Sequence, residues 1–366
     1  MSENAQKPRI RFKGFSDAWE QRKLGDLFNY YRPDNYIVKS DKYVENAPTP
    51  VLTANKGFIL GYTSENRTFS QPCIIFDDFT LDNKFVDFPF MVKSSAMKIL
   101  VLKDEKFDDL IFCYELLNST KIEVLGHARH YISVVQPTVV NIPRYEEQRR
   151  ISELFQQISN LITLHQRKYD KLVAVKKSLL EKMFPADGET VPKIRFKGFS
   201  DAWEQRKLNE LVSYHSSNLT ATDSCESGEY DLYDANTIIG KTNVEPISTD
   251  YITIIKDGAG VGRIRKMPAK TMFIGTMGGI TAEKSNLSFI YSLLIRFNLG
   301  NEFTGSTIPH IYFKDYGNNE YYVPSIREQQ VIGRYFDKID KLITLHQRQL
   351  EKLKNIKSAL LEKMFV

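Results

Sequence analysis

Two long stretches of the chain carry apolar residues at steps that alternate between four and three. They are Ile151–Met183 and Ile332–Met364, and each holds one histidine and one lysine at the same places in its series. This spacing lays a single apolar stripe along a helix, as the a and d positions do in a coiled coil. Pro143 and Pro324 precede the two stretches and end the extended chain before them. The pattern predicts two long helices that pack together, because neither is stable with its stripe exposed.

The stripes define the expected interface between the helices. If a pseudo-twofold axis relates the two, they run antiparallel, and the segment nearest the axis meets its own copy. We expect His165 and His346, near the middle of each helix, to lie close together there as polar residues that set the register. The expected interface residues are Ile151, Phe155, Ile158, Ile162, His165 and Leu172 in the first helix, and Ile332, Phe336, Ile339, Ile343, His346 and Leu353 in the second.

The segments before the two helices have short apolar runs, separated by turns rich in Gly, Asn and Asp. Pro50–Thr63 and Tyr230–Thr242 both contain an Ala-Asn pair, a glycine and an apolar run, and Cys73–Asp78 resembles Tyr251–Asp257. Runs and turns of this kind are typical of strands. The two inserts are therefore expected to share a mixed α/β fold while differing at most surface positions.

Long identical strings frame both halves of the chain. Ile10–Leu24 and Ile194–Leu208 have the same sequence, and so do Leu161–Arg167 and Leu342–Arg348. Matches of this length, repeated after about half the chain, indicate a duplicated domain rather than a solenoid of short repeats. A frame kept twice predicts two identical partners, and inserts that differ predict two different targets.

These patterns together predict an α+β protein. Two pseudo-symmetric, mixed α/β domains are separated by two long helices that form an antiparallel coiled coil, and 366 residues suffice for two domains of ordinary size. Pro, Asp and Gly in close succession break the first helix and begin a linker. The expected order is a domain over 1–143, a helix over 144–184, a linker over 185–191, a domain over 192–324 and a helix over 325–366.

Composition narrows the class of protein. A net charge of +5 permits a polyanionic partner without requiring one. Cys73, Cys113 and Cys225 lack the paired spacing of a zinc site or a disulfide framework. The sequence has neither an apolar run approaching the roughly 18 residues of a spanning helix nor a signal peptide. We expect a cytoplasmic protein that contacts no membrane and binds no metal.

The second insert has a glycine-rich string followed by arginines. No helix pattern follows Asp257–Gly262, so a hairpin opened by Asp-Gly is predicted there rather than a dinucleotide-binding loop. With a strand period of two, Arg263 and Arg265 share one face and Ile264 lies on the other. Arginine is the usual bidentate reader of guanine and a frequent phosphate clamp, which favours DNA. The alternative is a solvated surface strand.

Three further segments contain residues that could take part in catalysis or in DNA binding. The acids and lysine of Asp77–Lys84 imitate a nuclease cluster, but the second insert has no counterpart. Gly126–Tyr131 groups two histidines, an arginine and a tyrosine, and Gly305–His310 holds other polar residues at the corresponding place. Two domains that read different base sequences would need different polar residues at this place. The alternative is that both segments are ordinary loops.

No catalytic residue is predicted, because triad spacing, a methyltransferase tetrapeptide and a complete P-loop are missing from the sequence. The expected DNA contacts are polar and basic residues of the inserts. They are Asn55, Lys56, Arg67, Lys84, Lys93, His127, Arg129 and His130 in the first insert, and Asn236, Lys241, Arg263, Arg265, Lys266, Ser306, Thr307 and His310 in the second.

The repeated frame resembles the specificity subunits of type I restriction–modification enzymes. The resemblance covers nearly the whole chain. It is carried by the openings Phe12–Leu24 and Phe196–Leu208, by Ile142–Arg150 and Val323–Gln330 before the helices, and by the helix ends. It implies that each insert is a target-recognition domain that reads one half of a split, asymmetric DNA site, and that the helices fix the gap.

The resemblance also implies partners for a non-catalytic chain. They would be double-stranded DNA, two modification (methyltransferase) subunits and two restriction (endonuclease and translocase) subunits. S-adenosylmethionine, ATP and Mg²⁺ would belong to those subunits and not to this chain. Two alternatives stand beside this interpretation: a self-sufficient nuclease or methyltransferase fragment, and a coiled-coil adaptor that binds only proteins.

Overall fold

The structure is a computed structural model, and it describes residues 7–40, 42–55, 57–123, 129–186, 188–301, 303–305 and 309–366. Contacts between residues divide the chain into two compact units, each containing one insert and a part of each long helix. Unit 1 is Met1–His165 with Gln349–Val366, and unit 2 is Gln166–Arg348.

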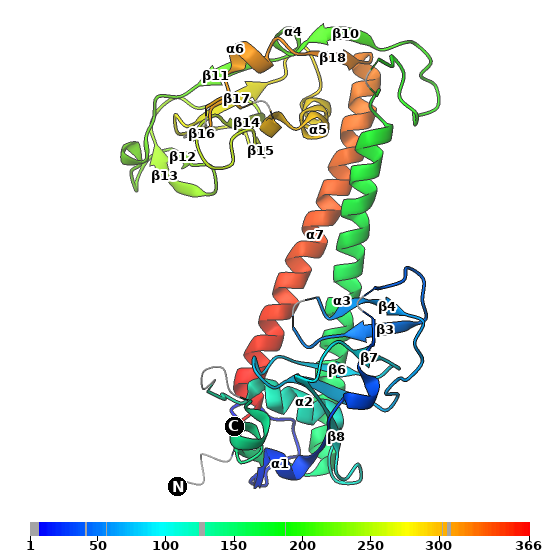
Figure 1. Ribbon diagram of the computed structural model, residues 1–366. Coiled ribbons are helices and arrows are strands. Elements are labelled where there is room, and N and C mark those ends of the chain that lie inside the picture. The colour runs from blue at the N-terminus through cyan, green and yellow to red at the C-terminus, as the bar shows by residue number, and fades with distance from the viewer. Residues whose placement is uncertain are drawn as a thin grey trace. The chain divides into compact units, whose positions relative to one another are not determined.

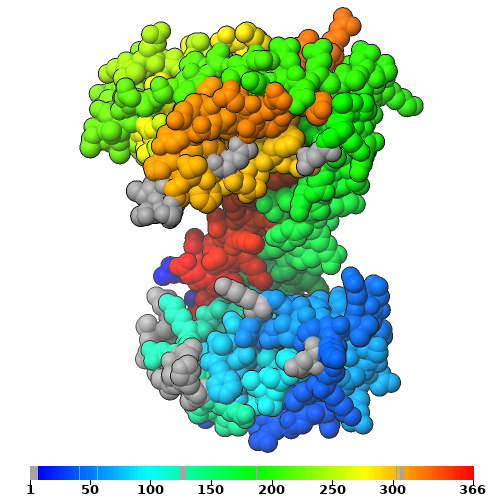
Figure 2. All heavy atoms as spheres, turned by 45° about the horizontal axis from the view of Figure 1, so that its top comes forward, coloured from blue at the N-terminus to red at the C-terminus, as the bar shows by residue number. Residues whose placement is uncertain are grey.

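Unit 1 is built from short strands and short helices beside its parts of the long helices (Figure 1). The strands pair in the orders β2-β8-β5-β6, β4-β3-β7 and β1-β9. They are β1 (Glu20–Lys23), β2 (Phe28–Tyr31), β3 (Thr49–Leu52), β4 (Ile59–Thr63), β5 (Cys73–Asp77), β6 (Asn83–Val86), β7 (Met91–Val92), β8 (Met97–Leu102) and β9 (Val139–Ile142). The helices are α1 (Leu24–Leu27), η2 (Asp34–Tyr36), α2 (Leu110–Ser119) and η3 (Tyr131–Val135). In the space-filling view, the residues from β2 to α2, drawn from blue to cyan, form one closely packed body (Figure 2).

Unit 2 repeats this plan. Its strands pair in the orders β11-β17-β14-β15, β13-β12-β16 and β10-β18. They are β10 (Glu204–Lys207), β11 (Ser213–Ser216), β12 (Tyr230–Tyr233), β13 (Ile238–Thr242), β14 (Tyr251–Ile255), β15 (Ile264–Met267), β16 (Thr271–Phe273), β17 (Met277–Thr281) and β18 (Glu320–Val323). The helices are α4 (Leu208–Leu211), η4 (Ala221–Asp223), α5 (Leu287–Phe297), η5 (Leu299–Asn301) and α6 (Phe313–Tyr316).

The strand order of the two units corresponds throughout, with β5 matching β14 and β6 matching β15. The register corresponds as well, because Ile75 faces Lys84 in unit 1 where Thr253 faces Arg265 in unit 2. The predicted mixed α/β fold shared by the two inserts is therefore confirmed.

Strand β5 explains why its sequence is a continuous apolar run. Ile74 and Phe76 pack into a core with Phe112 of α2, whereas Cys73 and Ile75 belong to a second core with the β3 sheet. A strand covered on both faces needs apolar residues at every position rather than at alternate ones. In unit 2, β14 is buried along its whole length in the same way.

The two long helices are α3 (Tyr145–Lys182) and α7 (Ile326–Met364), and both run from one unit into the other. In unit 1, the ring centroids of Phe155 and Phe365 are 5.8 Å apart, and Lys357 Nζ donates to Ser159 Oγ at 3.2 Å. Residue numbers fall on α7 as they rise on α3, so the two segments run antiparallel, as predicted (Figure 1).

The helix segments in unit 2 are arranged alike. Lys176 forms an ion pair with Asp340, and the rings of Phe184 and Phe336 lie 6.2 Å apart. Among the described residues, no helix combines the length and the apolar character needed to cross a membrane.

Part of each predicted stripe is buried. The buried stripe residues are Ile151, Phe155, Ile158, Ile332, Phe336 and Ile339, and the half-buried ones are Ile162, His165, Leu172, Ile343, His346 and Leu353. The proximity of His165 and His346 stays a prediction.

The repeated strings close each unit around the end of a long helix. In unit 1, Trp19 packs edge-on against Phe365 at 6.4 Å, and Phe112 stacks on Phe365 at 5.4 Å. In unit 2, Trp203 and Phe184 make the equivalent contact at 6.0 Å. Trp19 and Trp203 occupy the same place in the repeated string. Each unit thus uses its copy of the repeated string to bury the end of a long helix.

A buried ion pair fastens the same string to the start of each long helix. Arg11 donates two hydrogen bonds of 2.7 Å to the carboxylate of Glu147 at the start of α3. Arg195 makes the same two bonds with Glu328 at the start of α7. Bidentate Arg–carboxylate pairs fix orientation as well as distance. The helix starts are therefore held in the same way in both units.

Candidate nucleic-acid interface

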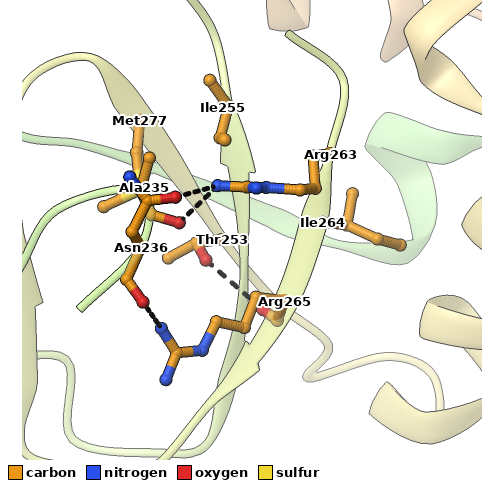
Figure 3. Close-up of a pocket in the computed structure, with 8 residues that line it drawn as sticks. All are labelled: Ala235, Asn236, Thr253, Ile255, Arg263, Ile264, Arg265 and Met277. Atoms are coloured by element: carbon orange, nitrogen blue, oxygen red, sulfur yellow. Dashed lines mark hydrogen bonds between the residues drawn. The ribbon is translucent and has the colours of Figure 1, made fainter. Parts of the chain in front are cut away.

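Arg263 and Arg265 of unit 2 lie against the turn between β12 and β13 (Figure 3). Arg263 Nη2 donates to Ala235 O at 2.7 Å and to Asn236 Oδ1 at 2.8 Å, and Arg265 Nη1 donates to Asn236 O at 3.2 Å. Because these bonds hold both guanidinium groups, the arginines are ordered before any ligand arrives. They line a pocket with Ala235, Asn236, Thr253, Ile255, Ile264 and Met277.

The turn that holds the arginines is itself rigid. Asp234 Oδ1 accepts hydrogen bonds of 2.7 Å from the backbone N–H groups of Asn236 and Thr237, an arrangement typical of an Asx turn. The guanidinium carbon of Arg265 lies 5.3 Å from the centre of the Tyr233 ring, within the range of a cation–π interaction. Turn and ring together fix the direction of Arg265.

This surface has the donors that base reading requires. Arg263, Arg265 and Asn236 are exposed, and each guanidinium has more N–H donors than its contacts with the turn use. Arginine donates to two acceptors of guanine in the major groove, whereas asparagine donates to N7 of adenine and accepts from the adenine amino group. The side of β15 on which Arg263 and Arg265 were expected therefore presents a preformed row of hydrogen-bond donors, which suit the acceptors of DNA.

The glycine-rich loop beside this row has a backbone that only glycine adopts easily. Gly258, Gly260 and Gly262 have φ values of +83°, +84° and +78°. At Gly262 a Cβ atom would lie 2.3 Å from the backbone nitrogen of Gly300. The predicted hairpin opened by Asp-Gly is thus a tight loop packed against another backbone segment.

Asp257, at the start of this loop, orients His310. Its Oδ1 lies 2.7 Å from His310 Nδ1, and both side chains are about one-third exposed, at 33% and 35%. With Nδ1 facing Asp257, the His310 Nε2 is the nitrogen available to a ligand. Burial, and then the charge of Asp257, raise the pKa of Tyr214 above its ordinary value of 10.0.

The other predicted residues of unit 2 lie in different settings. Lys241 on β13 pairs with Asp231 at 3.3 Å at the surface. Lys266 follows Arg265 on β15 but faces helix α7, where it pairs with Asp337. Ser306 and Thr307 lie outside the described residues.

In unit 1 the predicted residues are more dispersed. Arg67 is exposed, Asn55 and Lys93 are half-buried, and Lys84 on β6 is half-buried opposite Ile75. Lys56 and His127 lie outside the described residues.

Arg129 and His130 are neighbours with opposite exposure. Arg129 is exposed, with its guanidinium carbon 5.9 Å from the centre of the Phe79 ring. His130 is 0% exposed, and both its backbone N–H and its Nδ1 lie against the carbonyl oxygen of Asp78, at 2.9 and 3.1 Å. In this structure His130 is thus tied to the backbone at Asp78, and its contact with DNA stays a prediction.

The acids that imitate a nuclease cluster hold unit 1 together. Asp78 is buried, accepts a bond of 2.8 Å from the Tyr131 backbone N–H, and lies 3.3 Å from Lys98 Nζ. Asp77 Oδ1 accepts from the backbone of Phe79 and Thr80 in a turn. These contacts account for both carboxylates without a catalytic role.

Sequence patterns alone did not single out three parts of this site: Tyr233, Asp257 as a partner of His310, and the carbonyl of Ala235. Tyr233 and Ala235 lie on either side of Asp234, in the turn that contains the Ala-Asn pair. Because both inserts contain this pair, the sequence did indicate the turn. The contacts themselves join residues 28 to 53 positions apart and follow from the tertiary fold rather than from local sequence.

Comparison with known proteins places this geometry in a family. The model of the type I restriction modification DNA specificity domain matches residues 16–174 and 200–355, one match for each half. The chain is 29% identical to the EcoR124I/EcoR124II specificity subunit of Escherichia coli, over 87% of this chain and 86% of that protein. It is 21% identical to the MjaVIII specificity subunit of Methanocaldococcus jannaschii, over 94% and 91%.

A solved structure has the same fold. The S subunit of a type I restriction–modification system from M. genitalium superposes with a TM-score of 0.72 at 17% identity, covering 98% of this chain and 99% of that one. Two matched halves account for most of the chain. The chain therefore belongs to the family of type I restriction modification DNA specificity domains, as a non-catalytic specificity subunit of such a system.

Proposed function

We propose that this chain reads a bipartite, asymmetric DNA site, with one half read by each unit. The observation that carries the proposal is the preformed row of Arg263, Arg265 and Asn236 on a framework that unit 1 repeats with other residues. Equal frameworks with unequal surfaces suit two unlike half-sites, because base edges in the major groove differ in their donors and acceptors.

The gap between the half-sites depends on the long helices. Both α3 and α7 continue from one unit into the other without a break, and a helix rises about 1.5 Å per residue. Inserting one helical turn into both α3 and α7 should lengthen the gap that the complex accepts. An unchanged gap would contradict this part of the proposal.

The helices also offer a surface for two copies of one partner. Leu161 and Leu164 on α3 are 44% and 46% exposed, and Leu342 and Leu345 of the identical string on α7 are 44% and 48% exposed. Exposed leucines at helical spacing mark a contact surface. We assign it to two modification subunits, which bring S-adenosylmethionine and the methyl transfer.

Two restriction subunits, with ATP and Mg²⁺, complete the restricting form of the complex. The chain itself supplies sequence recognition and acts in the cytoplasm, where it meets double-stranded DNA. A protein-only adaptor would bind the same helical partners without selecting a DNA sequence.

The decisive experiment replaces Arg263 and Arg265 by alanine in the complex with the modification subunits. Methylation is measured on duplexes in which one half-site or the other is altered. Each bidentate base contact contributes about 1–3 kcal/mol of discrimination, so the loss of one should lower selectivity roughly ten- to a hundredfold, and the loss of both by more, at one half-site only. Arg206→Ala with Lys207→Ala removes the same two positive charges from strand β10 as a control. Equal loss at both half-sites, or no sequence-selective binding by the unaltered complex, would refute the proposal.

A further inference from the structure

Lys266 follows Arg265 in sequence, yet its side chain points to the opposite side of β15. Its ammonium group forms an ion pair with Asp337 of α7 and donates to Ser288 Oγ of α5 at 3.0 Å. It also lies 4.8 Å from the centre of the Tyr291 ring, within reach of a cation–π interaction. The strand that carries the arginines is therefore tied to two helices.

The polar side chains at this contact also bind one another. Ser288 Oγ donates to Asp337 Oδ2 at 2.7 Å, so lysine, serine and aspartate form a ring of polar contacts. The side chains of Lys266 and Asp337 are only 32% and 33% exposed. A network with several partners fixes one geometry better than a single exposed ion pair.

We propose that Lys266 and Asp337 are positioning residues for base reading, which hold β15 on α7 so that Arg263 and Arg265 meet the DNA in register. This inference rests on the function proposed above. Bidentate contacts tolerate errors of only about 0.5 Å, so a strand that shifts on its helix loses discrimination although its arginines remain. Neither Lys266 nor Asp337 needs to touch DNA for this effect.

The competing role for Lys266 is a direct phosphate contact, and the two roles differ in what Asp337 does. A phosphate contact depends on Lys266 alone, and its removal lowers the slope of log affinity against log salt by about 0.9. A positioning pair depends equally on both members. It changes discrimination between bases and leaves the salt slope unchanged.

The test compares Asp337→Asn and Lys266→Gln in the complex with the modification subunits. We expect both to reduce selectivity at the second half-site by the same factor, roughly tenfold, with selectivity at the first half-site and the salt slope unchanged. Exchange of the pair, Lys266→Asp with Asp337→Lys, should restore part of the selectivity. Asp170→Asn, an aspartate on the exposed side of α3, removes the same charge elsewhere and should change nothing.

Three outcomes decide between the proposals. Unchanged selectivity in Asp337→Asn, beside one-sided loss in the Arg263→Ala, Arg265→Ala variant, overturns the positioning role alone. A lower salt slope in Lys266→Gln only would show a phosphate contact and also overturn it. If the arginine variant itself shows no one-sided loss, the proposed function fails, whatever Asp337→Asn does.

Discussion

The two units attach their inserts to the long helices by ion pairs of opposite polarity. In unit 2 the lysine belongs to the insert and the aspartate to α7, whereas in unit 1 Lys357 of α7 lies 2.7 Å from Glu115 of α2. Glu115 is nearly inaccessible, with its side chain 3% exposed. The two pairs do not occupy equivalent places in the repeat, because the counterpart of Lys357 is Lys176, which pairs with Asp340. Each unit therefore attaches its insert to α7 through an ion pair of its own.

The positions at and just before β6 and β15 differ more. By strand register, Lys84 of unit 1 occupies the place of Arg265, and Asp82 occupies the place of Arg263. The buried strands below them have the same order and pairing. Buried packing constrains the framework, whereas exposed positions are free to change sign, and a pair of readers for unlike sequences requires that freedom.

Removing Lys357 tests the unit 1 attachment and should have the largest effect. Lys357→Met leaves Glu115 buried without its counter-charge, which should lower the free energy of unfolding of unit 1 by about 3 kcal/mol. The chain has two tryptophans, so Trp203→Phe leaves Trp19 as a fluorescent reporter of unit 1 in denaturant titrations. Adding Glu115→Gln should recover much of the loss, and no recovery would contradict a charge-based attachment.

The pH dependence follows from the same carboxyl group. Burial raises the pKa of Glu115 above its ordinary value of 4.5, and Lys357 opposes the shift. A carboxyl group with a raised folded-state pKa contributes its full stability below the unfolded value and loses it as pH rises through the folded value. Without Lys357 the pKa rises further. The deficit of Lys357→Met should therefore be largest near pH 7 and shrink toward pH 4.5, and a deficit constant over this range would contradict the assignment.

The glycine loop of unit 2 provides the next test. Gly262→Ala should destabilise unit 2 by about 2 kcal/mol, because the new Cβ meets backbone atoms of Gly300 in addition to the strain of a positive φ. Gly258→Ala has the same kind of φ, with no atom within 4 Å of the added Cβ, and should cost about 1 kcal/mol. Trp203 fluorescence in a Trp19→Phe background reports unit 2, and equal losses would show that close packing at Gly262 is unimportant.

Much of the architecture could be predicted from sequence because its signals are local. The four-three spacing marked both helices, and the identical strings marked the duplication. Strand parity placed Arg263 and Arg265 on one face, and the same parity would have separated Lys266 from them. Lys266 is counted with the two arginines among the expected DNA contacts because it is basic and follows Arg265 in the sequence. The polar neighbours of His130 predict a DNA contact, but they carry no signal for its burial, which follows from a non-local contact with Asp78.

The smallest effect is expected at Tyr233, whose ring supports Arg265. The Tyr233 ring is buried and the Arg265 guanidinium is exposed. A cation–π contact near the surface contributes about 0.5–1 kcal/mol, so Tyr233→Leu should reduce selectivity at the second half-site by a few-fold. Tyr233→Phe keeps the ring and should stay within about twofold of the unaltered complex. Both effects are measured by methylation of duplexes altered at one half-site. If Phe loses as much as Leu, the hydroxyl group and not the ring face supports the arginine.

The most direct measurement is to map methylated positions across a genome that carries this chain with its modification subunits, and then with Arg263→Ala and Arg265→Ala. Our account predicts an asymmetric, two-part motif with a fixed gap, in which the variant relaxes one part and leaves the other part and the gap unchanged. A continuous or symmetric motif, or a variant that erodes both parts together, would contradict it.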